Sequence, residues 1–202
     1  MAPRITEERW NETHQNILRT AERLFATKGF NGTSMNDIVK ESGVSKGAIY
    51  NHFENKERLF LTLIDEQTEV GLEQAGQLFS EDDTYTDRIK KIIHMTFGSS
   101  VSCPREMCMM QIEFMVTASR LESLQGDMQK RYSAIFDFIV DVVEEGKKAG
   151  EFRADLDSKS LVTLVYATLD GLGYQYATLG LSFDADILEK QLVEIIITGI
   201  QA

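Results

Sequence analysis

Proline, cysteine and histidine are all scarce in this chain of 202 residues. The 2 prolines, Pro3 and Pro104, leave long stretches without a helix breaker, which favours an all-helical fold. The 2 cysteines, Cys103 and Cys108, supply no disulfide framework, so we expect a reducing, cytoplasmic compartment. The chain has 3 scattered histidines and no HExxH, P-loop, Rossmann glycine or nucleophile-elbow pattern, which argues against an enzyme.

Basic charge is also in short supply, with 21 Lys and Arg against 32 Asp and Glu and a formal net charge of -11. Residues 1–58 hold 9 of the basic and 8 of the acidic side chains, so the deficit of basic charge lies wholly in residues 59–202. The acidic total argues against a protein coated in nucleic acid. It leaves room for a small DNA footprint near the N-terminus.

Long apolar runs are absent except for residues 161–183, which contain a single charge, Asp170. Threonines, tyrosines and glycines interrupt this run, so its hydropathy is too low for a membrane span. We expect a helix that is buried on several sides and no membrane partner. No leader segment is predicted, because residues 1–15 contain no apolar run.

Four helices are predicted in the first 79 residues. Apolar side chains recur at helical spacing over residues 9–28, and Gly29 follows. Ser34 with Asp37 marks a second helix that stops at Gly43, Ser45 caps a short third helix, and Asn55 caps a fourth that reaches about residue 79. Two short helices around a glycine turn predict a helix-turn-helix.

Two lysines stand at unusual places, directly after predicted helix caps: Lys46 follows Ser45, and Lys56 follows Asn55. A cation is unfavourable at a helix N-terminus, which itself attracts anions, so a phosphate nearby would explain the pair. Donors of the kind that contact a DNA backbone surround them: Thr33, Ser34, Ser45, Tyr50 and His52. On the outward face, Gly47 permits close approach to a groove, and Lys46 and Asn51 are suited to base edges.

Four or five further helices are predicted, with candidates over about 88–98, from Pro104, and over 121–149, 159–180 and 184–200. The last two carry apolar side chains on more than one face. We therefore expect a homodimer through a four-helix bundle built from these two helices of each protomer. A deeper core within one protomer is the alternative.

An effector pocket is predicted among the helices after residue 88. Its candidate lining residues are Met95, Phe97, Met107, Met110, Phe114, Met115, Tyr132, Phe136, Tyr166, Asp170 and Tyr174. Asp170 is suited either to a cationic or hydroxylated ligand or to a tyrosine or arginine of the protein itself. The methionines are equally typical of plain core.

The segment CPREMCMMQ, residues 103–111, resembles a soft-metal or thiol sensor in composition only. Cys103 and Cys108 are five positions apart, off a common helical face, and lack CxxC spacing. We expect no metal and no cofactor.

Residues 33–60, TSMNDIVKESGVSKGAIYNHFENKERLF, resemble the DNA-binding domain of TetR-family transcriptional regulators, and the upstream ILRTAERLFATKGFNGTS is similar too. The resemblance implies an all-α chain with a three-helix DNA-binding domain, residues 1–55, and a helical effector-binding and dimerisation domain, residues 56–202. It also implies a dimeric repressor that binds an inverted-repeat operator in double-stranded DNA and is released by a small molecule. Val39 replaces the family's usual alanine, and Asn51 lies at a variable position, so the operator sequence cannot be carried over.

By position, the resemblance implies backbone contacts from Thr33, Ser34, Ser45, Lys46, Tyr50, His52 and Lys56 and base readout near Gly47, Ala48 and Asn51. Simpler roles exist: caps for Thr33, Ser45 and His52, a solvated charge for Lys56, and a core-edge aromatic for Tyr50. A helical interaction module is the rival from another class. It predicts no salt-dependent DNA affinity.

Overall fold

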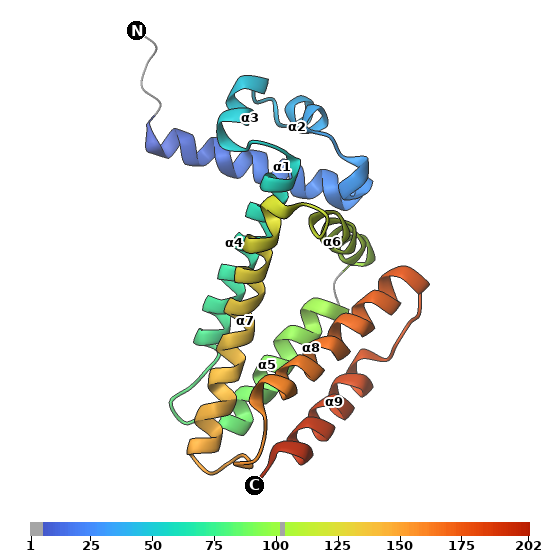
Figure 1. Cartoon of the computed structure of the whole chain (residues 1–202). Coiled ribbons are helices and arrows are strands. Elements are labelled where there is room, and N and C mark those ends of the chain that lie inside the picture. Colours follow the sequence, from blue (N-terminus) through green and yellow to red (C-terminus); the bar gives the residue numbers. More distant parts are fainter. Residues whose placement is uncertain (1–5, 102–103) are drawn as a thin grey trace.

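The computed structural model of the chain describes residues 6–101 and 104–202, the side chains of residues 99–101 excepted. These residues form nine α-helices and one short π-helix, which confirms the all-α prediction. In Figure 1 the N-terminal helices lie across the top of the molecule, and the later helices lie beneath them. We call the upper part the head (residues 7–52) and the lower part the body (residues 56–202).

The head consists of α1 (Glu7–Gly32), α2 (Met35–Ser42) and α3 (Lys46–His52). Both predicted caps form. The Ser34 side chain accepts from Asp37 N and the Asp37 side chain accepts from Ser34 N, while the Ser45 hydroxyl accepts from Ala48 N at 3.3 Å. Gly43 closes α2 with φ 68°, the left-handed conformation that glycine adopts easily. The helix-turn-helix therefore follows from local chemistry.

The end of α1 differs from the prediction. Gly29 has φ 76° and ψ 166°, so regular geometry does stop there, yet one more helical turn continues to Gly32. That turn carries Phe30, which is 1% exposed and lies among the rings of Phe25, Phe60 and Phe114. Burial of this ring explains why the chain bends at Gly29 and then continues as a helix.

The body begins with α4 (Lys56–Gln77), which descends from the head beside α7 (Glu122–Lys148). The other elements are α5 (Tyr85–Val101), α6 (Arg105–Ala118), α8 (Ser158–Tyr174), the π-helix η1 (Gln175–Leu179) and α9 (Ala185–Ile200). Pro104 is the N-cap of α6, one position before the first-turn place predicted for it. In Figure 1, α6 lies directly beneath α1, and α5, α8 and α9 lie lower in the molecule.

Two main apolar cores result. The head core joins α1, α2 and α3 to the first half of α4, and also takes in Met110, Phe114 and Ala118 of α6 and Leu124 of α7. The body core is mainly aliphatic, with the buried ring of Phe152, and is shared by α5, α7, α8 and α9. Because α6 contributes to the head core, a movement of α6 is transmitted to the head by direct packing.

Apolar side chains also remain exposed on the outer helices. Leu164 of α8 is 67% exposed, and Ile187 and Ile195 of α9 are 60% and 68% exposed. Side chains of this kind are usually covered when they gather on neighbouring helices.

Candidate DNA interface and effector cavity

The outward face of α3 is formed by Lys46, Gly47, Tyr50 and Asn51, all of which are exposed. Ile49, on the opposite face, is fully buried. Lys46 Nζ lies 5.9 Å from the centre of the Tyr50 ring, so a cation and an aromatic hydroxyl share one edge of the helix. No neighbouring atom lies within 4 Å of where a Cβ would stand at Gly47. A short helix with this surface can approach a DNA groove closely.

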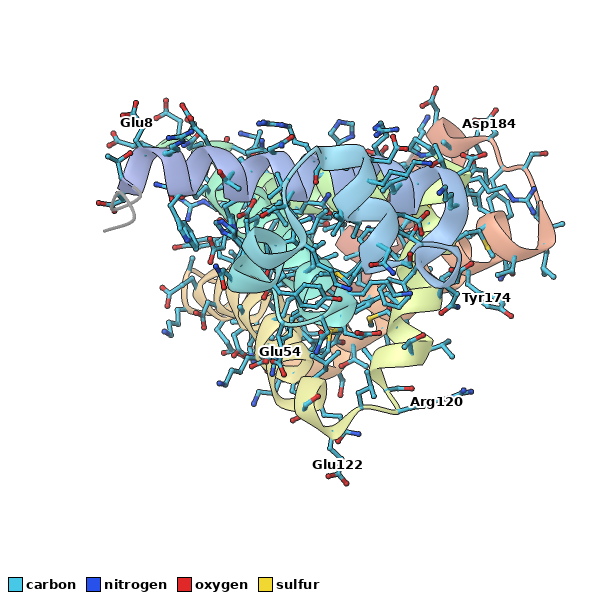
Figure 2. All side chains as sticks on the ribbon, turned by 90° about the horizontal axis from the view of Figure 1, so that it is seen from above. Glu8, Glu54, Arg120, Glu122, Tyr174 and Asp184 are labelled. Atoms are coloured by element: carbon cyan, nitrogen blue, oxygen red, sulfur yellow. The ribbon has the colours of Figure 1, made fainter. Side chains whose placement is uncertain are left out.

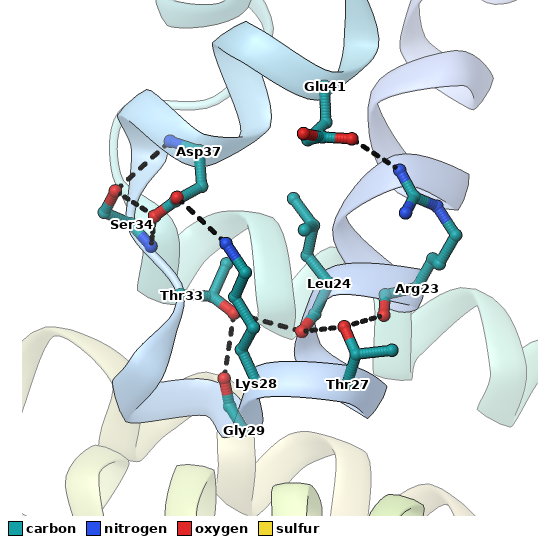
Figure 3. A network of polar contacts seen from close by, with 9 residues as sticks. All are labelled: Arg23, Leu24, Thr27, Lys28, Gly29, Thr33, Ser34, Asp37 and Glu41. Carbon is teal, nitrogen blue, oxygen red and sulfur yellow. Dashed lines mark hydrogen bonds and ion pairs between the residues drawn. The ribbon is translucent and has the colours of Figure 1, made fainter.

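The start of α2 is held by a polar network, drawn in Figure 3. Lys28 Nζ donates to Asp37 Oδ1 at 3.1 Å, and Ser34 donates to the same carboxylate. Hydrogen bonds from Ser34, and then the one from Lys28, hold the pKa of Asp37 well below its usual range. Ser34 itself is exposed, but its hydroxyl donates to Asp37 Oδ2 and accepts from Asp37 N. A phosphate contact from this hydroxyl requires the bond to Asp37 Oδ2 to be exchanged, and it stays a prediction.

Thr33 is the buried member of the predicted set of DNA contacts. It is 1% exposed, and its hydroxyl donates inward to Leu24 O (3.2 Å) and Gly29 O (2.9 Å), as Figure 3 shows. Thr33 therefore holds the turn before α2. A phosphate contact from its hydroxyl requires one of these internal bonds to be broken, and it stays a prediction.

Lys56 turns back onto the head. Its Nζ donates to Phe30 O at 2.8 Å and lies 4.3 Å from the centre of the Phe30 ring. Burial lowers the pKa of this ammonium. To contact DNA, Lys56 would have to exchange its bond to Phe30 O for a bond to a phosphate oxygen. The phosphate contact of Lys56 stays a prediction.

His52, at the end of α3, lies in an aromatic cluster with Trp10, His14 and Phe53. The ring centres are 4.3 Å apart for Trp10 and His52, 5.5 Å for His14 and His52, and 4.7 Å for His14 and Phe53. Nδ1 of each histidine is buried and has no hydrogen-bond partner among the described residues. Burial lowers the pKa of both imidazoles. The sequence analysis did not identify Trp10 and His14, although their spacing of four positions places them on one helical face.

A small cavity lies in the body core, with a volume of about 30 Å³. Its wall is formed by Ile89, Ile92, Ile93, Thr96, Ile139, Val143, Leu161, Val162, Val165, Tyr166, Leu169 and Ile196. Ligand pockets commonly measure about 300–1,000 Å³, so this cavity has to expand before it can hold an effector. Of the predicted lining residues only Tyr166 belongs to this wall.

The other predicted lining residues lie elsewhere. Met110 and Phe114 are buried in the head core and Met107 packs against it, because α6 lies beneath α1. Met115 is 50% exposed, and Phe97 forms a separate small cluster with Leu169. None of these five lines the small cavity, and their place in a common pocket stays a prediction. Met95 is half-buried on α5.

The remaining predicted residues gather beside Tyr166. The Tyr132 ring stands edge-on to the Tyr166 ring at 5.9 Å and stacks with Phe136 at 5.7 Å. Asp170 follows Tyr166 by one helical turn. Tyr174, one turn further on, is 53% exposed and lies at the edge of the molecule in Figure 2.

The soft-metal alternative gains no support. Within the described residues no group of three or more His, Cys, Asp and Glu side chains could hold a metal ion. Cys108 is disulfide-bonded, although the two cysteines are expected to supply no disulfide framework, and Cys103 lies outside the described residues. The search of the same residues for a helix able to cross a membrane found none.

Comparison with protein families gives two matches. Residues 17–63 match "Bacterial regulatory proteins, tetR family", and residues 86–196 match "Tetracyclin repressor-like, C-terminal domain". The first covers the helix-turn-helix and the second covers most of the body.

Similar proteins are transcriptional regulators. The fatty acid metabolism regulator protein of Bacillus subtilis is 23% identical over 93% of this chain and 95% of its own. The HTH-type transcriptional regulator TtgR of Pseudomonas putida is 29% identical over 84% of this chain and 82% of its own.

Solved structures share the fold. A putative transcriptional regulator from Saccharomonospora viridis in complex with choline superposes with a TM-score of 0.79, at 22% identity over 95% of this chain and 99% of the other. FadR from Bacillus subtilis in complex with stearoyl-CoA superposes with a TM-score of 0.75, at 20% identity over 93% of this chain and 99% of the other. With the C-terminal match alone covering residues 86–196 of 202, and the helix-turn-helix matched in front of it, this chain belongs to the TetR family of bacterial transcriptional regulators and is not an enzyme.

Proposed function

We propose that the chain is a dimeric repressor that binds an inverted-repeat operator and is released by a small-molecule effector. The observation that carries this is the exposed face of α3, where Lys46, Gly47, Tyr50 and Asn51 follow the Ser45 cap. In the proposed complex α3 enters a major groove, Lys46 and Tyr50 contact backbone phosphates, and Gly47, Ala48 and Asn51 face the bases. The Ser34 and Ser45 helix starts add phosphate contacts.

The dimer is proposed to form through α8 and α9. Leu164, Ile187 and Ile195 are the exposed apolar side chains that this contact would cover. Burying each of them contributes about 1.5–3 kcal/mol. Two copies related by a twofold axis present two α3 helices, which suits an operator with two inverted half-sites.

Effector release is proposed to start from the collapsed cavity in the body core. A ligand that occupies it has to separate α5 from α7 and α8, whose side chains form the wall. Arg58 of α4 pairs with Asp127 of α7 and donates to Ser123 O at 2.9 Å, and Arg131 Nε donates to Thr68 Oγ1 at 2.7 Å. A displaced α7 therefore carries α4 with it, and α4 sets the spacing of the heads. The ligand acts by favouring one spacing over another.

The division of the chain into residues 1–55 for DNA binding and 56–202 for effector binding and dimerisation is part of the same proposal. The first half of α4 and part of α6 share the head core, so the two units are expected to unfold together.

The effector is not specified by the fold. Neighbours with the same fold bind ligands as different as stearoyl-CoA and choline. The chemical class has to be inferred from the side chains of this chain.

Transcription in vitro tests the repressor assignment. The template carries a selected operator across a promoter, and a second template carries the same promoter with a scrambled operator. We expect the protein to reduce transcript from the first template only. A rise in transcript would show an activator instead.

A further inference from the structure

Asp170 is a carboxylate without a counter-ion. It is the single charge between residues 161 and 183, and it forms no hydrogen bond or ion pair with any residue that the structure describes. Its side chain reaches solvent, yet burial by the surrounding protein raises the pKa of the carboxyl group. The alternative from the sequence, a partner tyrosine or arginine within the protein, is not realised here.

Aromatic rings gather around Tyr166, which lies one helical turn before this carboxylate. Tyr132 is 48% exposed, its ring stands edge-on to Tyr166 at 5.9 Å, and Phe136 stacks on Tyr132 at 5.7 Å. Burial, followed by the proximity of Tyr132 and Asp170, raises the pKa of Tyr166 to about 12. The tyrosine therefore stays neutral at physiological pH. Neutral ring faces beside a carboxylate attract organic cations.

One cation, Arg131 of α7, also acts on Tyr166 and opposes the rise of its pKa, but its guanidinium group is engaged with α4. Arg131 Nε donates to Thr68 Oγ1 at 2.7 Å and lies 3.8 Å from the Asp65 carboxylate, both on α4. Its charge is thus paired with an acid, whereas the charge of Asp170 is not. The charge left uncompensated beside Tyr166 is negative, which favours a cationic ligand over an anionic one.

Tyr166 lies between Asp170 and the apolar cavity, because its side chain forms part of the cavity wall. Val162, Val165 and Leu169, on one flank of Tyr166, form the cavity wall together with Tyr166 itself. Asp170 follows Tyr166 by one turn on the other flank. A ligand that displaces the Tyr166 ring therefore meets aliphatic side chains inward and the carboxylate outward.

Asp170 lies on a different flank of α8 from the proposed dimer face. Asp170 and Leu164 are six positions apart on α8, which is about 120° around the helix axis. A partner helix packed over Leu164 thus leaves the Asp170 flank open.

We propose that the effector site takes an amphipathic organic cation, with its apolar part in the aliphatic cavity and its charged group against Asp170, Tyr132 and Tyr166. This inference rests on the proposed effector function of the body. It names the ligand class for that function.

Three probes with the same apolar chain test the charge preference: dodecyltrimethylammonium, dodecanoate and dodecanol, each below the concentration at which it aggregates. Calorimetry on the full chain measures each affinity. We expect dodecyltrimethylammonium to bind at least about tenfold more tightly than dodecanoate. Equal or tighter binding of dodecanoate would overturn the inference.

Variants locate the site. Asp170→Asn should abolish the preference for the cation, while Asp137→Asn, which alters an exposed carboxylate of α7, should leave it intact. Tyr132→Phe should retain cation binding and Tyr132→Leu should weaken it, because only the first keeps a ring. A preference for the cation that survives Asp170→Asn would also overturn the inference.

Operator affinity, measured with and without each probe, separates this inference from the proposed function. If the operator is bound but no probe binds in an Asp170-dependent manner, the cation site fails and DNA binding stands. If the cation binds through Asp170 without weakening operator binding, the site stands and effector release fails.

Discussion

The carboxylate of Glu113, in α6 of the body, accepts a hydrogen bond from the backbone N–H of Asn31, in the last turn of α1, at 3.1 Å. Next to it, Phe114 packs on Phe30 with ring centres 5.3 Å apart. The end of α1 is thus held by adjacent residues of α6, one through a polar contact and one through an apolar contact.

Removing the Glu113 carboxylate should loosen this junction. We expect Glu113→Ala to lower the free energy of unfolding by about 1 kcal/mol and to speed hydrogen exchange at the Asn31 amide. Glu113→Gln retains an acceptor and serves as the matched control, with near-normal exchange. Unchanged protection of Asn31 in the alanine variant would show that the contact does not hold the turn.

Gly29 should tolerate substitution less well than Gly43. Gly29 has φ 76° and ψ 166°, a region that essentially only glycine occupies, whereas Gly43 has φ 68° and ψ 5°, the left-handed helical region that other residues enter at modest cost. A Cβ at Gly29 would also lie 3.0 Å from the Glu113 carboxylate. Urea unfolding should show a loss of about 2–3 kcal/mol for Gly29→Ala and about 1 kcal/mol for Gly43→Ala. The reverse order would contradict the backbone geometry.

Leu164 should control association. A charge buried at the proposed interface opposes dimer formation, so Leu164→Glu should raise the dimer dissociation constant by at least about tenfold in sedimentation equilibrium. Val70→Glu is the control, because Val70 is 51% exposed on α4, away from α8 and α9. A Leu164→Glu variant that dimerises normally would exclude this face.

The histidine cluster should make stability depend on pH. Burial lowers the pKa of His14 and His52 below the usual 6.5, although Glu66, with Oε1 3.7 Å from His14 Nε2, opposes the shift at His14. The unfolded chain then binds protons more readily than the folded one. Stability should therefore be complete above about pH 6.5 and fall as pH drops toward the folded pKa values.

The double variant His14→Phe and His52→Phe keeps the ring stacking but removes the titrating imidazoles. Its free energy of unfolding should therefore vary less between pH 7 and 5. His94→Phe is the control, since the His94 side chain is 78% exposed and lies on α5. A double variant with an unchanged pH profile would assign the acid sensitivity to other groups.

The head could be predicted closely from the sequence, and the effector region could not. Ser34, Gly43 and Ser45 act through bonds to residues within a few positions, so the sequence pattern alone identifies them. Met110 and Phe114 show helical apolar spacing, which predicts a buried face but not the element that covers it. That element is α1, some 80 positions away in the chain, as the bond from Asn31 to Glu113 shows.

Thr33 and Lys56 illustrate the same limit at the DNA interface. The residue types suit phosphate, but bending of the chain at Gly29 brings carbonyl groups within reach of both side chains. The aliphatic cavity was missed for a related reason. Its wall combines Ile89, Ile139 and Val162, which lie on three helices that are far apart in the sequence. Each of them is an ordinary core residue by itself.

Selection of bound duplexes from a random pool, with the full-length protein, tests the central claim most directly. The account predicts an enriched inverted repeat bound by two protomers, with affinity that falls as salt rises. Lys46→Ala and Tyr50→Ala should weaken operator binding while the dimer persists. Lys46→Ala should also reduce the slope of log affinity against log salt concentration by about one, the loss of one phosphate contact. No enrichment by a folded dimer at low salt, or full operator affinity in both variants, would contradict the assignment of α3 as the DNA-reading helix.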